Sequence, residues 1–206
     1  MICHLPLSNG VALTFDDGPD PDFTSRVLDE LKRVDARATF FLVGRQAAAV
    51  PAIVRRIVAA GHAIGSHSHR HPEPGERGWG VIADFVKGRR QVERAAGRRV
   101  TLFRAPKGYI ARRERWAIAA ARVQPWSWTI DAEDWQPGIS RERIVANAGS
   151  VTAGDVLLLH DGICGPLAPE ARDRSATVQA IAGIVDMVRS RGHDLVTLPE
   201  PAPTGS

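Results

Sequence analysis

Five short polar clusters stand along this chain, each at the point where an apolar run ends. They are Thr14–Pro19, His67–Pro72, Arg104–Gly108, Asp131–Trp135 and Leu157–Asp161. Between them they hold histidines, carboxylates and an arginine, which are side chains that bind metals and transfer protons. Polar groups that repeatedly follow strand ends are typical of a barrel enzyme, whose active site is built from loops at one end of the strands. The spacing therefore predicts one active site assembled from distant segments.

The histidine cluster and the first acidic cluster together predict a metal site. His67 and His71 lie in a turn-rich segment that ends in proline, so both imidazoles can converge on one ion. Asp16 and Asp17 are the candidates for a carboxylate ligand. Two histidines and one carboxylate leave positions open for water, as in catalytic sites. We predict one divalent ion, zinc in the first place, with cobalt or manganese as alternatives because the same ligands accept them.

Each part of this pattern also has a plainer explanation. A histidine-rich loop can be ordinary surface, and His69 competes with the two proposed ligands; Asp-Asp-Gly-Pro is a common turn sequence. We interpret Trp126 and Trp128 as strand packing, because a period of two places both rings on the same face. His62 and His193, inside predicted strands, are interpreted as packing residues as well.

Composition predicts a single domain over residues 1–198 with a flexible tail at 199–206. The chain has 206 residues with 44% hydrophobic content, enough for one substantial core. Its 27 Lys and Arg exceed its 23 Asp and Glu by four, and pairs such as Arg55-Arg56 and Arg89-Arg90 fit solvated helix surface. We therefore expect no nucleic-acid partner.

Two further absences shape our expectations of location and redox chemistry. Met1–Gly10 has no signal-peptide pattern, and no apolar run approaches the roughly 18 residues of a membrane span, so we expect no membrane span and a cytoplasmic location. Cys3 and Cys164 have no CxxC spacing, which indicates neither a disulfide framework nor a structural zinc site. The residues leave the oligomeric state open.

Short β-rich runs alternate with segments of helical period along the whole chain. Helical patterns follow at 81–96, near 113–122, after Ser140 and after Ser175, which we expect to be an N-cap. The predicted strands are Val11–Phe15, Ala38–Val43, His62–Gly65, Val100–Phe103, Pro125–Ile130, Asp155–His160 and His193–Leu198. This alternation predicts an α/β fold with a parallel sheet and outer helices, a small irregular barrel with its site at the C-terminal strand ends.

The five clusters resemble the five motifs of the polysaccharide deacetylase family. These are the carbohydrate esterases of family four, which share the nodulation-type chitooligosaccharide deacetylase domain, and the match spans residues 11–198. The resemblance implies a distorted (β/α)7 barrel that removes the N-acetyl group from an amino sugar. It also implies that Asp17, His67 and His71 hold the metal.

Hydrolysis of an amide requires an activated water and a proton for the departing amine. Asp16, beside a metal ligand in sequence, is the expected general base, and similarity to the family assigns Arg104 the task of keeping Asp16 ionised. His160 is the expected general acid, and Asp134 resembles the family residue that keeps this imidazole protonated. The acetyl pocket would be shaped by two further residues, Trp135 and Leu158. Asp131 and Asp161 are expected to be structural.

Lys107 departs from the family pattern, in which an aromatic residue follows Arg-x-Pro. The resemblance implies that its backbone N–H stabilises the developing oxyanion, a group that lysine also has. With Arg112, Arg113 and Arg115 it forms a basic group that is either a solvated helix start or a contact for a phosphate or carboxylate on the substrate.

The resemblance therefore predicts a deacetylase of N-acetylglucosamine units, and the segment from Arg172 to Leu198 favours a soluble oligosaccharide or a small N-acetylated sugar as substrate. Two alternatives stay open: a hydrolase of a non-sugar amide on the same fold, and a non-catalytic carbohydrate-binding relative. A glycosidase is disfavoured, because Asp16 and Asp17 are sequence neighbours and its two carboxylates must stand about 5 Å or more apart.

Overall fold

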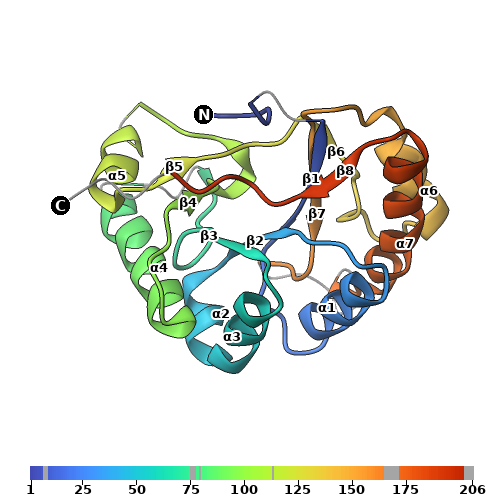
Figure 1. Ribbon diagram of the computed structural model, residues 1–206. Coiled ribbons are helices and arrows are strands. Elements are labelled where there is room, and N and C mark those ends of the chain that lie inside the picture. The colour runs from blue at the N-terminus through green and yellow to red at the C-terminus, as the bar shows by residue number, and fades with distance from the viewer. Residues whose placement is uncertain (7–8, 75–77, 79, 113, 165–171, 202–206) are drawn as a thin grey trace.

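The computed structural model describes residues 1–6, 9–74, 78, 80–112, 114–164 and 172–201. Within them, eight strands pair in parallel to form one strongly curled sheet (Figure 1). The strands are β1 (Gly10–Asp16), β2 (Thr39–Leu42), β3 (Ala63–Ser66), β4 (Leu102–Phe103), β5 (Gln124–Pro125), β6 (Ile130–Asp131), β7 (Val156–His160) and β8 (Asp194–Val196).

The strand order is β5-β4-β3-β2-β1-β7-β6, and β8 pairs with the first half of β1. Among the described residues, β5 and β6 do not pair with each other, so the barrel is open between them. The N-terminal segment lies at this opening: Ile2 bridges to Trp126, and the Leu5 N–H donates to the carbonyl of Gly154 at 2.8 Å. The predicted distorted barrel of parallel strands is confirmed.

Helices cover the outside of the curled sheet on three sides in the view of Figure 1. Their apolar residues recur at helical spacing; in the first helix Val27, Leu28 and Leu31 are buried against the sheet layer. The helices are α1 (Phe23–Arg33), α2 (Gly44–Ala49), α3 (Pro51–Ala59), α4 (Val81–Ala96), α5 (Glu114–Ala121), α6 (Arg141–Asn147) and α7 (Ser175–Ser190), with short 3-10 turns η2 (Pro106–Gly108) and η3 (Ala148–Ser150).

The central strand β1 shows how the fold directs polar groups into the barrel. All seven of its residues are buried. Leu13 and Phe15 belong to the large core under the helices, whereas Ala12 belongs to a smaller core inside the barrel. Successive side chains of a strand point to opposite faces, so Thr14 and Asp16 share the inner face with Ala12. The register places Asp16 beside His160 of β7.

Two predictions about the elements are wrong in detail. The strand predicted at Pro125–Ile130 is two short strands, because the chain leaves β4 after Pro125 and crosses the open side to pair with β7. Ser175 is not an N-cap but the first residue of α7; Arg174 is the cap residue, and the Asp173 carboxylate accepts from the Ser175 N–H at 2.8 Å. Ser140, in contrast, does cap α6 by accepting from the Arg143 N–H.

In the predicted tail, Glu200 forms an ion pair with Arg98, and residues 202–206 lie outside the described part. None of the helices in the described residues combines the length and hydropathy that crossing a membrane requires.

Candidate active site

A pocket of about 460 Å³ opens at the carboxyl ends of the strands, where the sequence places its polar clusters. It brings together eight of the ten predicted site residues as wall residues: Asp16, Asp17, His67, His71, Lys107, Trp135, Leu158 and His160. The other two, Arg104 and Asp134, are 0% and 1% exposed and lie directly behind Asp16 and His160. All five clusters therefore meet at one place.

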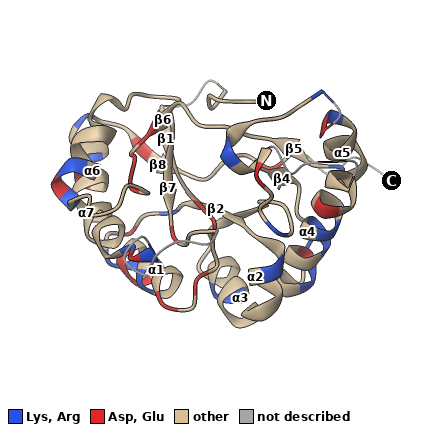
Figure 2. Cartoon of the chain, turned by 180° about the vertical axis from the view of Figure 1, so that it is seen from behind, with Lys and Arg blue, Asp and Glu red and all other residues tan. Residues whose placement is uncertain are grey.

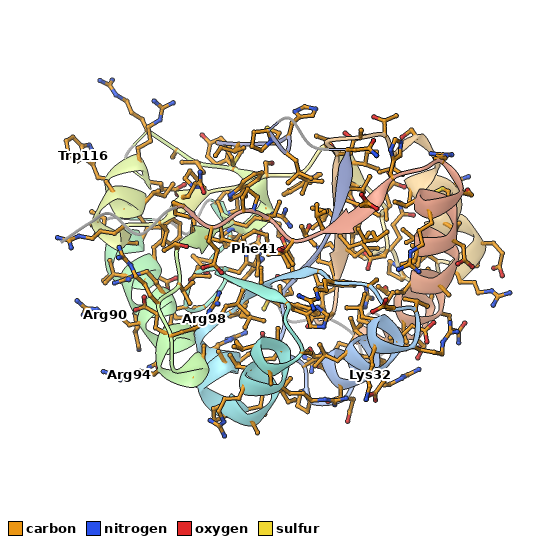
Figure 3. All side chains as sticks on the ribbon, in the orientation of Figure 1. Lys32, Phe41, Arg90, Arg94, Arg98 and Trp116 are labelled. Atoms are coloured by element: carbon orange, nitrogen blue, oxygen red, sulfur yellow. The ribbon has the colours of Figure 1, made fainter. Side chains whose placement is uncertain are left out.

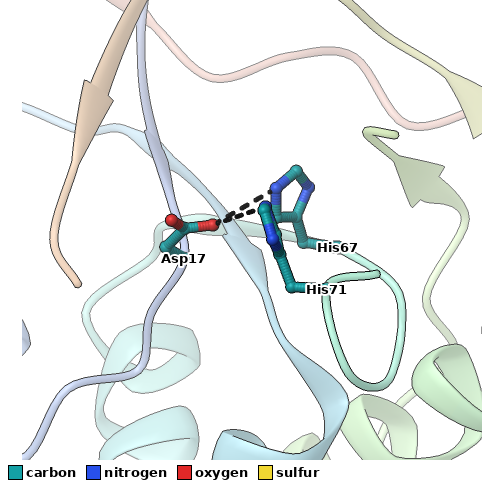
Figure 4. Close-up of side chains that lie close together, drawn as sticks. All are labelled: Asp17, His67 and His71. Atoms are coloured by element: carbon teal, nitrogen blue, oxygen red, sulfur yellow. Dashed lines mark ion pairs between the residues drawn. The ribbon is translucent and has the colours of Figure 1, made fainter. Parts of the chain in front are cut away.

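Asp17, His67 and His71 form a buried cluster with the geometry of a metal site (Figure 4). One ligand atom from each lies within 4.8 Å of the other two. Asp17 Oδ1 lies 3.4 Å from His67 Nε2 and 3.2 Å from His71 Nε2. His69, the competing histidine, is not part of this cluster; its backbone N–H donates to Asp84.

The proton positions on these side chains suit a cation. His67 Nδ1 lies 2.8 Å from the carbonyl of Arg104, which can only accept, so Nδ1 carries the proton and Nε2 presents a lone pair to Asp17. Burial lowers the pKa of His71 to about 4, which makes this imidazole neutral at neutral pH. Two imidazoles and one carboxylate are a donor set that divalent transition metals accept.

Asp17 itself is held in place and charged. Its Oδ2 accepts from the backbone N–H of Cys164 at 3.2 Å, whereas Oδ1 accepts no hydrogen bond from the described residues. Burial alone would raise the pKa of Asp17, but the neighbouring His67, His71 and His160 hold it well below its usual range. A buried carboxylate oxygen without a donor is costly unless a cation meets it, so the residues present fit a bound metal.

Asp16 stands at the edge of this cluster, held from behind by Arg104. Arg104 Nη1 donates to Asp16 Oδ1 at 2.7 Å and to Thr14 Oγ1 at 2.8 Å, and Nη2 donates to the carbonyl of Ser127 at 2.8 Å. The guanidinium lies 4.2 Å from the ring centroid of Phe41, which is labelled in Figure 3. Arg104 thus fixes the position of Asp16 with its side chain, and that of His67 with its carbonyl.

His160 lines the pocket from β7, the strand beside that of Asp16, and is held by Asp134. His160 Nδ1 lies 2.7 Å from Asp134 Oδ1, and the His160 backbone N–H donates to Asp134 Oδ2 at 2.8 Å. Thr177 and Arg174 fix the same aspartate, through Oδ2 and the main-chain carbonyl. Burial would lower the pKa of His160, but the Asp134 carboxylate outweighs it and raises that pKa to about 9. The imidazole is therefore protonated at neutral pH.

The third cluster forms a tight turn against one wall of the pocket. Lys107 and Gly108 have left-handed backbones, with φ of 57° and 65°. A Cβ on Gly108 would lie 2.4 Å from the Trp128 ring, so only glycine fits this approach. The Lys107 ammonium lies 3.6 Å from Glu73 at the exposed rim. Arg113 of the predicted basic group lies outside the described residues.

Trp128 extends one interpretation made from the sequence. Trp126 is buried in the inner core and Trp128 packs against the same core, so both rings share a face as the period of two predicts. Trp128 in addition lines the pocket and lies over the Arg104 guanidinium. The packing interpretation also holds for His62, which is buried, and is wrong for His193, which lies at the surface against Asn9.

The sequence did not indicate most of the residues that hold the site side chains in place by hydrogen bonds. Thr14 and the Ser127 carbonyl fix Arg104, Thr177 and Arg174 fix Asp134, and the Cys164 N–H fixes Asp17. Only Thr14 stood inside a recognised cluster, where the inward face of the first strand could have indicated it. Of the expected structural aspartates, Asp161 accepts from Thr24, and Asp131 accepts from the Glu133 N–H while also lining the pocket.

Comparison with known proteins gives a consistent set of relatives. A family model described as polysaccharide deacetylase matches residues 7–126. A peptidoglycan-N-acetylglucosamine deacetylase of Bacillus cereus is 36% identical, over 92% of this chain and 86% of that protein. A chitooligosaccharide deacetylase of Sinorhizobium fredii is 37% identical, over 92% of this chain and 90% of its own length. A solved peptidoglycan N-acetylglucosamine deacetylase superposes with a TM-score of 0.85 at 33% identity, covering 96% of this chain and 90% of that one.

Proposed function

Because this chain belongs to the polysaccharide deacetylase family and is a hydrolase of carbon–nitrogen bonds other than peptide bonds, we propose that it removes the N-acetyl group from an amino sugar. The proposed substrate is an N-acetylglucosamine unit of a soluble oligosaccharide, or a small N-acetylated sugar. One observation carries the proposal. Asp16 and His160, each with a buried partner, flank the Asp17, His67 and His71 cluster in a single pocket.

Asp17, His67 and His71 would hold one divalent ion, for which we propose zinc, with cobalt or manganese as alternatives. Such an ion polarises a carbonyl oxygen and lowers the pKa of a water molecule. The fit rests on the neutral imidazole of His71, on the hydrogen bond that leaves His67 Nε2 facing the cluster, and on the Asp17 oxygen that has no hydrogen-bond donor among the described residues.

The chain's own residues supply the proton transfers. Asp16, paired with Arg104, accepts the proton of the attacking water. His160, kept protonated by Asp134, donates a proton to the departing sugar amine. The two groups line the same pocket from neighbouring strands, so one can take a proton while the other gives one. The backbone N–H of Lys107 would stabilise the developing oxyanion.

The rest of the wall suits an acetyl group on a sugar. Leu158 and Trp128 present apolar surface beside the metal cluster, and Trp135 is 44% exposed at the mouth, where a sugar ring would enter. A non-catalytic carbohydrate-binding relative would have no need of the paired Asp16 and His160. A non-sugar amide is the second candidate, and the exposed Trp135 favours a sugar over it.

Acetate release tests the proposal directly. Protein stripped by a chelator and resupplied with zinc, cobalt or manganese is incubated with N-acetylated chitooligosaccharides of several lengths. We expect metal-dependent acetate from the native chain, and no metal binding and no acetate from Asp17→Ala or His71→Ala. Metal binding without acetate on any of these sugars would overturn the sugar substrate and favour a non-sugar amide. The cytoplasmic location stays a prediction, checked by fractionation of the source cells.

A further inference from the structure

A row of basic side chains runs along the outer face of α4. Lys87, Arg90 and Arg94 are exposed and have no hydrogen-bond or ion-pair partner among the described residues, whereas Arg89 on the flank pairs with Glu93 at 2.7 Å. Figure 2 shows basic segments along this helix. With a rise of 1.5 Å per residue, the row from Lys87 to Arg94 is roughly 10 Å long. No carboxylate of the described residues pairs with these three cations, so the face carries concentrated positive charge.

The same face is hollowed along its length. A groove of about 710 Å³ is lined by Lys87, Arg90 and Arg94 together with the apolar Ile82 and Val86. A second groove of about 520 Å³ shares Arg90 and Arg94 and continues to Arg98, with Glu93 also in its lining. Glu93 pairs with Arg89 and Arg98 pairs with Glu200, so the cations common to both grooves, Arg90 and Arg94, are the ones without an ion pair among the described residues. A path through two grooves fits an extended partner better than a small ion.

Trp116 adds an aromatic platform beside this path. It lies on α5, which packs against α4, and is 74% exposed. Arg90, Arg94 and Trp116 project from the same edge of the molecule in Figure 3. An indole face buries apolar area against the flat face of a sugar ring, whereas an exposed tryptophan without a partner leaves that area in water.

The face also connects with the pocket. Lys107 lines the pocket, and Arg112 and Arg115, both exposed, stand between it and Trp116 in the chain. Positive charge thus extends from the pocket rim over α5 and α4.

We propose that this surface, defined by Lys87, Arg90, Arg94 and Trp116, binds a polysaccharide strand that carries carboxylate or phosphate groups. The choice of a polysaccharide as partner rests on the proposed function. The requirement for negative charge on the partner rests only on the cations of this surface. A membrane would require several large apolar side chains, and the described residues of this face expose one, Trp116. Nucleic acid would favour several aromatic residues among the cations, for stacking of successive bases.

Affinity electrophoresis tests the proposal by comparing migration of the protein in gels that contain a charged or a neutral polysaccharide with the same cellulose backbone. Carboxymethylcellulose is anionic and hydroxyethylcellulose is neutral, and neither contains an N-acetyl group. We expect carboxymethylcellulose to retard the native chain, the neutral polymer to leave it unaffected, and the retardation to weaken as salt increases. The triple variant Lys87→Gln, Arg90→Gln, Arg94→Gln should lose affinity by about tenfold or more. Trp116→Ala should lose less, because it retains every cation.

A matched variant controls for net charge. Lys32→Gln, Arg37→Gln, Arg55→Gln removes three exposed cations from other surfaces and should bind as the native chain does. Equal loss of affinity in both triple variants, or unchanged affinity in the α4 variant, would show that this surface is not the binding site. Tighter binding to double-stranded DNA or to vesicles of anionic phospholipid than to carboxymethylcellulose would show that the partner is not a polysaccharide. Acetate release from a short neutral chitooligosaccharide should be the same in the native chain and both triple variants. If no chain releases acetate, the proposed function fails while the binding result stands.

Discussion

Two charge pairs in the pocket have the same construction in opposite orientation. In one pair the carboxylate of Asp16 faces the pocket and the cation Arg104 is buried behind it. In the other pair the imidazole of His160 faces the pocket and the carboxylate of Asp134 is buried behind it. A buried partner stabilises the charged form of the group in front of it. One pair therefore presents a proton acceptor and the other a proton donor.

The two pairs also differ in how they are supported. Arg104 is fixed by neighbours on the inner face of the barrel, Thr14 and the Ser127 carbonyl. Asp134 is fixed instead by Thr177 of α7 and by Arg174 immediately before it. The acceptor side thus depends on the sheet and the donor side on a docked helix. This difference predicts different consequences when each pair is broken.

The largest effect should come from removing the acceptor. Asp16→Asn keeps the size of the side chain but cannot accept a proton as a base, so kcat should fall by about 10²- to 10⁴-fold. Metal content, measured by elemental analysis, should not change because Asp17, His67 and His71 are intact. Retained activity in this variant would contradict the assignment of Asp16 as the base.

Breaking the pair behind Asp16 should mainly affect stability. Arg104→Met leaves a buried carboxylate without its cation, which costs about 3–5 kcal/mol of the free energy of unfolding. Urea unfolding measures the loss as a lower midpoint. Arg33→Gln, which removes an exposed partner of Glu30 on α1, should leave the midpoint where it is. Equal midpoints for Arg104→Met and the native chain would show that Arg104 is not a structural partner of Asp16.

Breaking the pair behind His160 should shift the pH dependence. The raised pKa of about 9 keeps His160 protonated at neutral pH, and a proton donor loses activity as pH rises through its pKa. Asp134→Asn removes the carboxylate, burial then dominates, and the alkaline limit of kcat should move to lower pH. We expect a loss of about tenfold or more at pH 8 and a smaller loss at acidic pH. An unmoved alkaline limit would argue that another group is the acid.

The smallest effect should come from the helix that supports Asp134. Thr177→Val removes one hydrogen bond to Asp134 Oδ2, a contact worth about 0.5–1.5 kcal/mol, so kcat should fall only a few-fold. The alkaline limit should move in the same direction as for Asp134→Asn, by less. Thr152→Val, at the opposite end of β7, removes a comparable bond to Asp155 and serves as the control. A shift of equal size in both variants would mean that Thr177 acts only through stability.

The amino-acid sequence alone predicts which residues could form the site and where along the chain they stand. Apolar runs that end in polar clusters mark the carboxyl ends of the strands, and parallel strands gather these ends at one edge. The inward direction of Asp16 follows from the period of two in β1, and the spacing of His67 and His71 follows from one loop.

The orientation and support of those residues come from contacts between distant parts of the fold. The Arg104 carbonyl fixes the tautomer of His67, α7 supplies the hydroxyl that holds Asp134, and Trp128 both packs on the inner core and lines the pocket. The gap between β5 and β6 was likewise not visible in the alternation of strands and helices. Each of these contacts joins groups whose direction depends on the path of the chain between them. Local periodicity carries no information about that path, which is set by packing across the whole barrel.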